Sequence, residues 1–476
     1  MSACQKVLDT PELMNMTMEL LSHPDLARVA LTRSSMFRYA APVIWRTLPG
    51  LQWLLCLLMT PKDWDRAFKN GTCRISLTVI NHANRQRRQR YHMYRPLVCN
   101  LLIFCDHLPP EFRENPESPP NTRYDPCTFT GFNSALQPRP IFPALSRLMV
   151  YRTGAVTQHE LEALLSQCCA APSCIEVDLR GLTVYQTNRQ TNLVQSLSPL
   201  WNGCASLKVL DLGECQDYTG SFDHEQLTLQ VNKLLSLEEL RVDPKFLTRD
   251  LYDAIGMLPS LRNLTLVGSV FEPFNTNLSE ALRDANFHFL ALEELNIHAS
   301  DWTRPALLSL RGLPHLFSSL KSVMIQVDTR EFSRNPDLLL VATASSRLKR
   351  LTLVHRSMYP RFTNGTLSLG PLDHRGFRQL ELYNIALSAS GQISTVFCNN
   401  PAWRYTLTDL IIPSQHVDAD DLYNLAGQLP NLSYLSVTLR IEYIPDGPSQ
   451  TGPLSQQKLR LKSEAWPATQ ELEFIQ

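Results

Sequence analysis

The stretch Ser206-Leu207-Lys208-Val209-Leu210-Asp211-Leu212 spaces three apolar residues as L-x-x-L-x-L. The same spacing recurs down most of the 476-residue sequence, at Leu145/Leu148/Val150, Cys174/Val177/Leu179, Leu237/Leu240/Val242, Leu261/Leu264/Leu266, Leu292/Leu295/Ile297, Leu320/Val323/Ile325, Leu348/Leu351/Leu353, Phe377/Leu380/Leu382, Leu407/Leu410/Ile412 and Leu432/Leu435/Val437. The first residues of successive triplets are 24 to 33 positions apart. This near-constant phase indicates a repeated structural unit.

The last two apolar residues of each triplet are two positions apart, so a β-strand places both on one face. A single repeat cannot bury that face, and neighbouring repeats must therefore stack into a continuous core. The repeat length is at the long end of the leucine-rich-repeat range. The sequence therefore predicts an α/β leucine-rich-repeat solenoid, with parallel strands on the concave face and helices on the convex face. The alternative is an ordinary α/β domain with coincidental spacing.

Helices are expected between the strands. Residues 157–160 (Thr-Gln-His-Glu) have the pattern of a capping box. Apolar residues follow at helical spacing, at Leu161, Leu164, Leu165 and Cys168. This segment predicts one helix of the convex face.

Bulk composition excludes several classes of function. The chain carries 45 basic and 45 acidic residues, so its net charge implies no general attraction to nucleic acid or acidic membranes. Its twelve cysteines form no C-x-x-C pair. The cluster Cys168, Cys169 and Cys174 is better explained by small buried thiols in a reducing compartment than by zinc. No signal region opens the chain, and the longest apolar run, 51–59, is too short to span a bilayer. We expect an intracellular protein, cytoplasmic, nuclear or both.

Residues 7–48 differ from the repeats. Asp9-Thr10-Pro11-Glu12 is typical of a helix start. Pro24 restarts a helix that is expected to continue through Phe37, and Pro42 is expected to interrupt it before residues 43–48 close the segment. Three short helices in about forty residues lie near the lower size limit for an independent fold. Such a segment is expected to complete its core against a partner or against the next repeat.

Residues 7–48 resemble an F-box, on Leu8-Asp-Thr-Pro11-Glu12-Leu13, Leu20-Leu21, Pro24-Asp25-Leu26, Val29-Ala30-Leu31-Thr32-Arg33 and Trp45-Arg46-Thr47-Leu48. This sequence is similar to those of the F-box proteins with degenerate leucine-rich repeats that are common in mushroom-forming fungi. The resemblance implies that the box docks on the Skp-type adaptor of a cullin-RING ubiquitin ligase. By motif position, the implied adaptor-binding set is Pro11, Leu20, Leu26, Val29, Leu31 and Trp45. The alternative is a helical cap that shields the first repeat.

Residues 49–108 contain degenerate first repeats. Strand candidates are Ile75/Leu77/Val79 and Val98/Leu101/Ile103. Between them lies a basic segment, Arg85-Gln-Arg-Arg-Gln-Arg90, with Tyr91, His92 and Arg95 beyond. Clustered arginines beside an aromatic residue could bind phosphate, RNA or a nuclear import receptor, or could form a solvated surface.

The remaining boundaries follow composition. Residues 109–143 are rich in proline and are expected to form an irregular, partly disordered insertion. The solenoid is expected to cover 144–440, and residues 441–476 form a tail that opens with a Pro/Gly/Ser-rich stretch.

No phosphate-binding glycine loop, zinc-protease motif or nucleophile elbow is present in the sequence. We therefore expect a non-enzymatic chain with no cofactor and no metal. A binding surface follows from geometry instead, because residues between the inward leucines of a strand point the other way. These concave-face candidates are Asp178, Asp211, Glu239, Arg241, Asp243, Asn296, His298, Arg350, Glu381 and Tyr383. The early strands are acidic on balance, and we hypothesise that they attract a basic segment of the target.

Two functions stay open at this stage. The first is the substrate-recognition subunit of an SCF-type ubiquitin ligase, whose partners are a Skp-type adaptor, the cullin complex and an unknown target protein. The second is a stand-alone leucine-rich-repeat scaffold or inhibitor without any ligase. Neither reading involves a membrane or nucleic acid.

Overall fold

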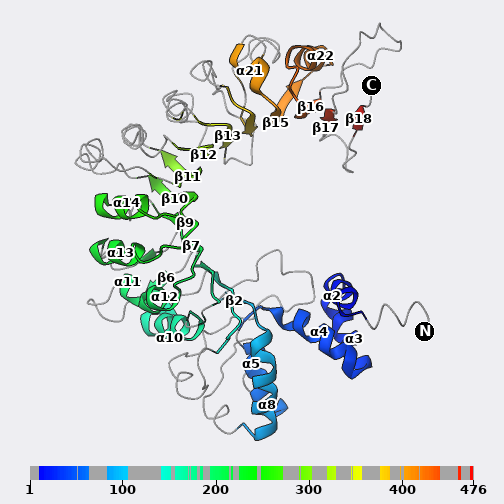
Figure 1. Cartoon of the computed structure of the whole chain (residues 1–476), viewed down its shortest axis with the longest axis vertical. Helices are drawn as coiled ribbons and strands as arrows, with labels where there is room; N and C mark the ends of the chain where they lie inside the picture. Colours follow the sequence, from blue (N-terminus) through cyan, green and yellow to red (C-terminus); the bar gives the residue numbers. More distant parts are fainter. Residues whose placement is uncertain are drawn as a thin grey trace. The chain divides into compact units, whose positions relative to one another are not determined.

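The computed structural model describes residues 10–50, 52–63, 83–104, 141–151, 156–169, 171, 173–179, 183–185, 193–213, 216–217, 224–243, 248–271, 289, 291–302, 319–327, 345, 347–355, 376–385, 387, 397, 401–417, 419–439, 459–461 and 472–474. The chain divides into two compact units, Met1–Leu237 (unit 1) and Glu238–Gln476 (unit 2). Figure 1 labels their helices and strands.

Unit 1 begins with three helices, α2 (Pro11–Glu19), α3 (His23–Thr32) and α4 (Ser34–Arg46). Proline stands in the first turn of both α2 and α3, where its missing N–H costs nothing. The Ser22 hydroxyl accepts the Asp25 backbone N–H and so caps α3. Met14, Met18, Leu26 and Ala40 form the small core that the three helices share. The three expected helices are therefore present.

The break between the second and third helices lies elsewhere than the sequence predicted. Arg33 is extended (φ −154°) and ends α3, so Phe37 belongs to α4. Pro42 does not interrupt the chain but lies inside α4, which continues to Arg46. A helical φ suits the proline ring, and the loss is limited mainly to one backbone hydrogen bond. Burial of Ala40 and Ala41 on the same helix offsets that loss.

The rest of unit 1 alternates strands with helices. Its parallel strands pair in the order β1-β2-β3-β5-β7, with a second small parallel sheet β4-β6-β8. The elements are β1 (Thr47–Leu48), α5 (Gln52–Leu55), η1 (Cys56–Leu58), α8 (Arg85–Tyr94), η3 (Arg95–Leu97), β2 (Asn100–Phe104), β3 (Arg147–Tyr151), β4 (Val156–Thr157), α10 (Gln158–Cys168), β5 (Glu176–Asp178), β6 (Thr183–Tyr185), α11 (Leu193–Ser196), α12 (Ser198–Gly203), β7 (Val209–Leu212), β8 (Gln216–Asp217) and α13 (His224–Val231). The basic segment is thus a helix, α8. Strand β2 confirms the second degenerate candidate, and the first one, 75–79, lies outside the described residues.

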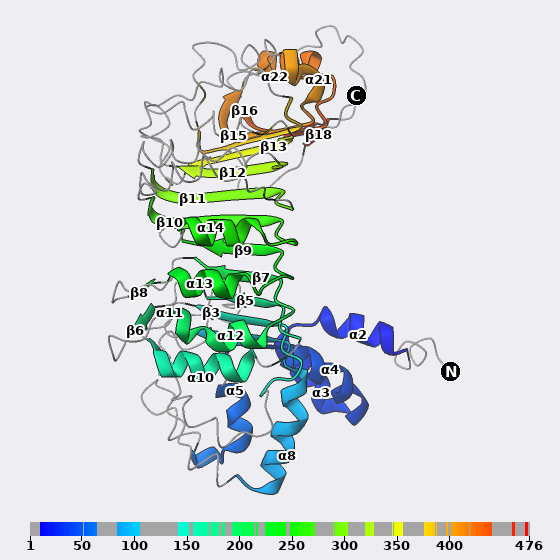
Figure 2. The same cartoon turned by 60° about the vertical axis from the view of Figure 1, so that its left-hand side comes forward.

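Unit 2 repeats the same design. Strands β9 to β16 pair in parallel in chain order, and Figure 2 shows β10 to β13 stacked one above another. The elements are β9 (Glu239–Val242), α14 (Arg249–Gly256), β10 (Asn263–Phe271), β11 (Glu294–Trp302), β12 (Ser322–Val327), β13 (Arg350–His355), β14 (Gln379–Tyr383), α21 (Pro401–Thr406), β15 (Asp409–Val417), α22 (Ala419–Gln428) and β16 (Tyr434–Leu439). Two further strands, β17 (Leu459–Leu461) and β18 (Leu472–Phe474), pair antiparallel in the tail.

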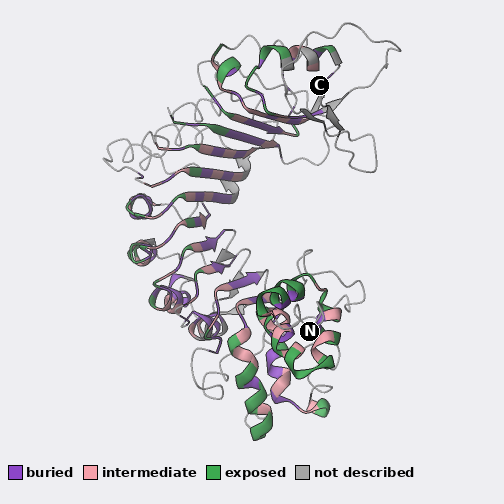
Figure 3. Cartoon of the chain, turned by 45° about the vertical axis from the view of Figure 1, so that its right-hand side comes forward, coloured by how far each residue is buried: buried purple, intermediate pink, exposed green. Residues whose placement is uncertain are grey.

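The core lies where the apolar triplets predict it. The second anchors Leu210, Leu264, Leu351 and Leu435 are at most 2% exposed. Along β10, β11 and β12, buried residues alternate with less buried ones at positions 263–266, 294–298 and 322–326, and banding of this kind is visible in Figure 3. Helix α10 likewise buries Leu161, Leu164, Leu165 and Cys168, as its spacing predicts. The strands of each unit therefore bury the face that carries the anchors, and the described helix α10 buries its apolar face as well.

Candidate functional site

The candidate site is built from strand residues that point away from the buried leucines. In each strand these residues alternate with the anchors, and parallel pairing brings equivalent positions into one row. We call this side of the strands the ladder face. Its middle row is Leu102, Met149, Asp178 and Asp211 in unit 1. In unit 2 the row is Arg241, Thr265, Asn296, Met324, Thr352, Glu381, Ile411 and Ser436.

The structure thus brings the predicted concave-face residues together within each unit. Asp178 lies directly beside Asp211. Two further candidates, His298 and Tyr383, share the next row of unit 2 with Val267, Gln326 and Val354. Arg350 and Gln379 are neighbours in the row that precedes the middle one.

The strongest polar cluster of the ladder face centres on Glu381. Its Oε1 accepts hydrogen bonds from the Arg350 guanidinium (2.8 Å) and the Gln379 amide, and its Oε2 accepts one from the Thr352 hydroxyl (3.2 Å). The hydrogen bond to Glu381 raises the pKa of Arg350. Burial is the main cause that raises the pKa of Tyr383, and the negative charge of the nearby Glu381 raises it further. Glu381 is therefore a buried acceptor that orients its neighbours, while the Arg350 side chain stays partly exposed.

Two further polar pairs lie on the ladder face of strands β10 to β12. The His298 ring Nδ1 is 2.7 Å from Gln326 Oε1, and the Asn296 amide donates to Asn263 Oδ1 (3.1 Å). Gln326 and Gln379 were not among the sequence candidates. The signal for Gln326 was available, because it follows its last apolar anchor as His298 does.

The acidic residues of the early strands are mostly covered. Asp178 and Asp211 are only 5% and 8% exposed, and Asp243 is also buried. Asp211 Oδ1 accepts the backbone N–H of Gly213 at 2.8 Å, so this carboxylate holds the turn after β7. Glu239 is exposed. The attraction of a basic segment to these strands stays a prediction.

The residues implied by the F-box resemblance lie in three different environments. Leu26 is buried in the core of helices α2–α4, and Val29 packs against it. Leu20 and Leu31 are 87% and 88% exposed, and Pro11 is exposed as well. Trp45 instead stacks on Tyr94 of α8, with ring centroids 4.5 Å apart.

Other kinds of site were sought among the described residues. Within these residues, no group of three or more His, Cys, Asp or Glu side chains could hold a metal ion. Cys168, Cys169, Cys174 and Cys204 are buried free thiols. None of the described helices combines the length and apolarity needed to cross a bilayer.

No family model and no curated protein matches the chain. Among solved structures, the chain is similar to one from the complex of TLR13 with ssRNA13 (15% identity, TM-score 0.38, covering 74% of this chain and 44% of that one). It is also similar to the leucine-rich repeat-containing protein LegL7 from Legionella pneumophila (11% identity, TM-score 0.28, covering 62% of this chain and 94% of that one). The chain spans less than half the length of the first of these structures. The repeat spacing and the register of the parallel strands are those of the leucine-rich-repeat fold.

Proposed function

We propose that this chain is a non-catalytic protein-recognition subunit, in which helices α2–α4 dock on a Skp-type adaptor of an SCF-type ubiquitin ligase and the ladder faces bind the target protein. The observation that supports docking on the adaptor is the exposed apolar surface of these helices. Leu13 and Met16 of α2 and Leu20, the residue directly after it, recur at i, i+3 and i+7, and all three are exposed. Leu31 of α3 is exposed too.

These exposed residues are not needed for the core of the helices themselves. That core uses the opposite side of α2, at Met14 and Met18. A small helical segment that leaves several large apolar side chains in water is typical of an interaction surface. In this proposal Leu20 and Leu31 contact the adaptor, and Leu26 and Val29 hold the helices together.

A second candidate function has its own supporting observation. Strand β1 directly follows α4 and pairs in parallel with β2, and Trp45 of α4 stacks on Tyr94. The helical segment is therefore joined to the first repeats, as expected of a cap in a stand-alone scaffold or inhibitor. The two roles use different residues, so one experiment separates them.

The test compares two matched double variants of the full chain. Leu20→Lys with Leu31→Lys changes the exposed leucines of α2 and α3. The control, Leu229→Lys with Leu235→Lys, makes the same change at leucines of unit 1 that are 59% and 61% exposed. Co-precipitation with a purified Skp-type adaptor is expected to fall at least about tenfold for the first pair only, because apolar contacts in an interface core dominate its affinity. An unmodified chain that does not bind the adaptor would overturn the ligase role and favour the scaffold.

A further inference from the structure

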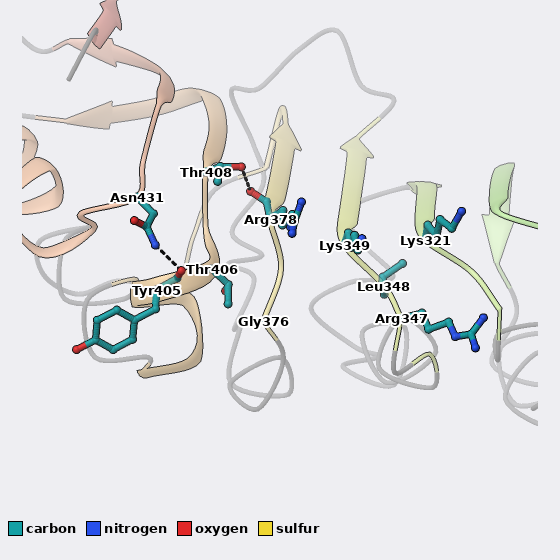
Figure 4. A pocket seen from close by; sticks show the side chains of 10 residues that line it. All are labelled: Lys321, Arg347, Leu348, Lys349, Gly376, Arg378, Tyr405, Thr406, Thr408 and Asn431. Atoms are coloured by element: carbon teal, nitrogen blue, oxygen red, sulfur yellow. Dashed lines mark hydrogen bonds between the residues drawn. The ribbon is translucent and has the colours of Figure 1, made fainter. Parts of the chain in front are cut away.

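Unit 2 contains a pocket on the side of the strands where β12 to β15 begin. Its volume is about 680 Å³, within the range of pockets that hold small ligands or peptide segments. The ten lining residues, drawn in Figure 4, include four cations and no carboxylate: Lys321, Arg347, Lys349 and Arg378. Such a concentration of one charge is unexpected in a chain whose formal net charge is zero.

The cations are placed by the repeat itself. Lys321, Lys349 and Arg378 each immediately precede a strand, one residue after a buried anchor. The backbone N–H of Lys349 donates to the carbonyl of Lys321 (2.8 Å), and that of Arg378 donates to Lys349 (2.8 Å). The three residues therefore occupy successive rungs, about 4.8 Å apart in a parallel sheet. Side chains on neighbouring rungs can thus contact one anionic group together.

Most of this charge is uncompensated. Lys321 pairs with Glu293 at 2.6 Å, and that contact lowers the pKa of the Glu293 carboxyl. Among the described residues, no carboxylate pairs with Arg347, Lys349 or Arg378. All three side chains are exposed. Their mutual repulsion would be relieved by a bound anion of more than one charge.

The opposite wall adds neutral contacts. The Tyr405 ring is 63% exposed, and the guanidinium of Arg404 lies 5.7 Å from its centroid. The Asn431 amide donates to the Tyr405 carbonyl at 2.6 Å and so fixes this wall (Figure 4). The Tyr405 ring points away from the four cations, so the charged side of the pocket and its neutral side are separate (Figure 4).

We propose that this pocket binds a phosphorylated serine or threonine within a segment of the target protein. A phosphomonoester carries nearly two negative charges at neutral pH and three acceptor oxygens, which match lysine and forked arginine donors. The volume leaves room for residues that flank the phosphate, and Thr406, Thr408 and Asn431 line the neutral side of the pocket. This inference rests on the proposed role of the chain in binding a protein target, and it names the chemical mark that the target carries.

The test uses the full chain and a fluorescent peptide pool with a central phosphoserine between degenerate flanks. The same pool without phosphate, free tripolyphosphate and a single-stranded RNA oligonucleotide serve as the other arms. The pocket variant is Lys349→Glu with Arg378→Glu. The control is Lys208→Glu with Arg262→Glu, which reverses the same number of charges at equivalent positions before β7 and β10, outside the pocket.

The unmodified chain and the control are expected to prefer the phosphorylated pool by about tenfold or more, and the pocket variant is expected to lose that preference. Equal binding of both pools, or an equal loss in the control, would overturn the proposal. The proposal would also be overturned if tripolyphosphate or RNA bound in a way that depends on the pocket while the phosphopeptides did not bind. If the charge reversal prevents folding, Lys349→Gln with Arg378→Gln is expected to reduce the preference in the same direction. None of these assays involves the adaptor, so failure here is distinct from failure of docking at α2–α4.

Discussion

At the scale of single residues, the ladder face is held by contacts that join different repeats. Glu381 is the clearest example, because its carboxylate is buried while its main cationic partner, Arg350, has a side chain that is 47% exposed. The ion pair is therefore partly screened by solvent, and its net contribution is smaller than that of a fully buried pair. Its structural value lies in satisfying an acceptor that water cannot reach.

The prediction at this scale concerns that ion pair. Arg350→Ala is expected to lower the free energy of unfolding by about 1–3 kcal/mol, because it removes a hydrogen bond from a buried carboxylate. In a chain that already carries Glu381→Gln, the same substitution should cost less, since the neutral amide needs no cation. Urea denaturation of the four members of this double-mutant cycle measures the difference. Equal costs in both backgrounds would show that Arg350 and Glu381 are not coupled.

At the scale of elements, aromatic rings join the N-terminal helices to the first repeats. Tyr94 of α8 stacks on Trp45 at an interplanar angle of 26°, and Phe37 meets Tyr94 edge to face at 6.1 Å. Both partners of Tyr94 lie on α4. Burial raises the pKa of Tyr94, as expected for a ring packed between two helices. This contact gives the basic helix α8 a structural role independent of its arginines.

The prediction at this scale is that Tyr94→Ala loosens α4 and α8 together. Loss of the ring contacts should cost about 1 kcal/mol or more. Hydrogen exchange followed by mass spectrometry is expected to be faster in both helices and unchanged in β9–β16. Tyr94→Phe is the control, because it keeps the ring and both aromatic contacts. Faster exchange in α8 alone would mean that the stacking does not hold α4.

At the scale of the whole molecule, stability is distributed within each unit along a stack of strands in which each repeat contacts its neighbours. Each of strands β10 to β15 pairs with the strands of the adjacent repeats on both sides. A repeat protein of this kind gains stability from each repeat and from each interface between neighbours. Damage to one repeat should therefore spread first to the repeats beside it in the same unit.

The prediction at this scale uses Leu351, a fully buried second anchor in β13. Leu351→Ala is expected to cost about 2–5 kcal/mol, because it removes apolar contacts and leaves a cavity. Amide exchange should rise most in β12, β13 and β14, less in β9 and β16, and least in unit 1. Leu235→Ala, at a largely exposed leucine, should leave exchange unchanged. A uniform rise across both units would show that they unfold as one cooperative body.

The repeat strands could be predicted because their signal is local. An anchor such as Leu351 is apolar whichever repeat lies beside it, and its spacing from Leu348 and Leu353 is sufficient to place a strand. The register of the ladder face followed from the same spacing, which is why Asp178 and Asp211 were expected to be neighbours. The break at Arg33 was missed because Pro42, the stronger breaker by composition, is tolerated inside α4.

What sequence alone determined is therefore the repeat, the faces of its strands and the short helices before it. Only the tertiary structure decided which polar residues meet. Glu381 and Arg350 are 31 positions apart, and Lys321, Lys349 and Arg378 line one pocket with Tyr405 and Asn431. Such contacts depend on stacking, because residues one repeat apart become neighbours only when parallel strands pair. The burial of Asp211 could not be predicted for the same reason. The sequence shows that this strand position carries an acid, but burial depends on which residues of neighbouring repeats pack over it.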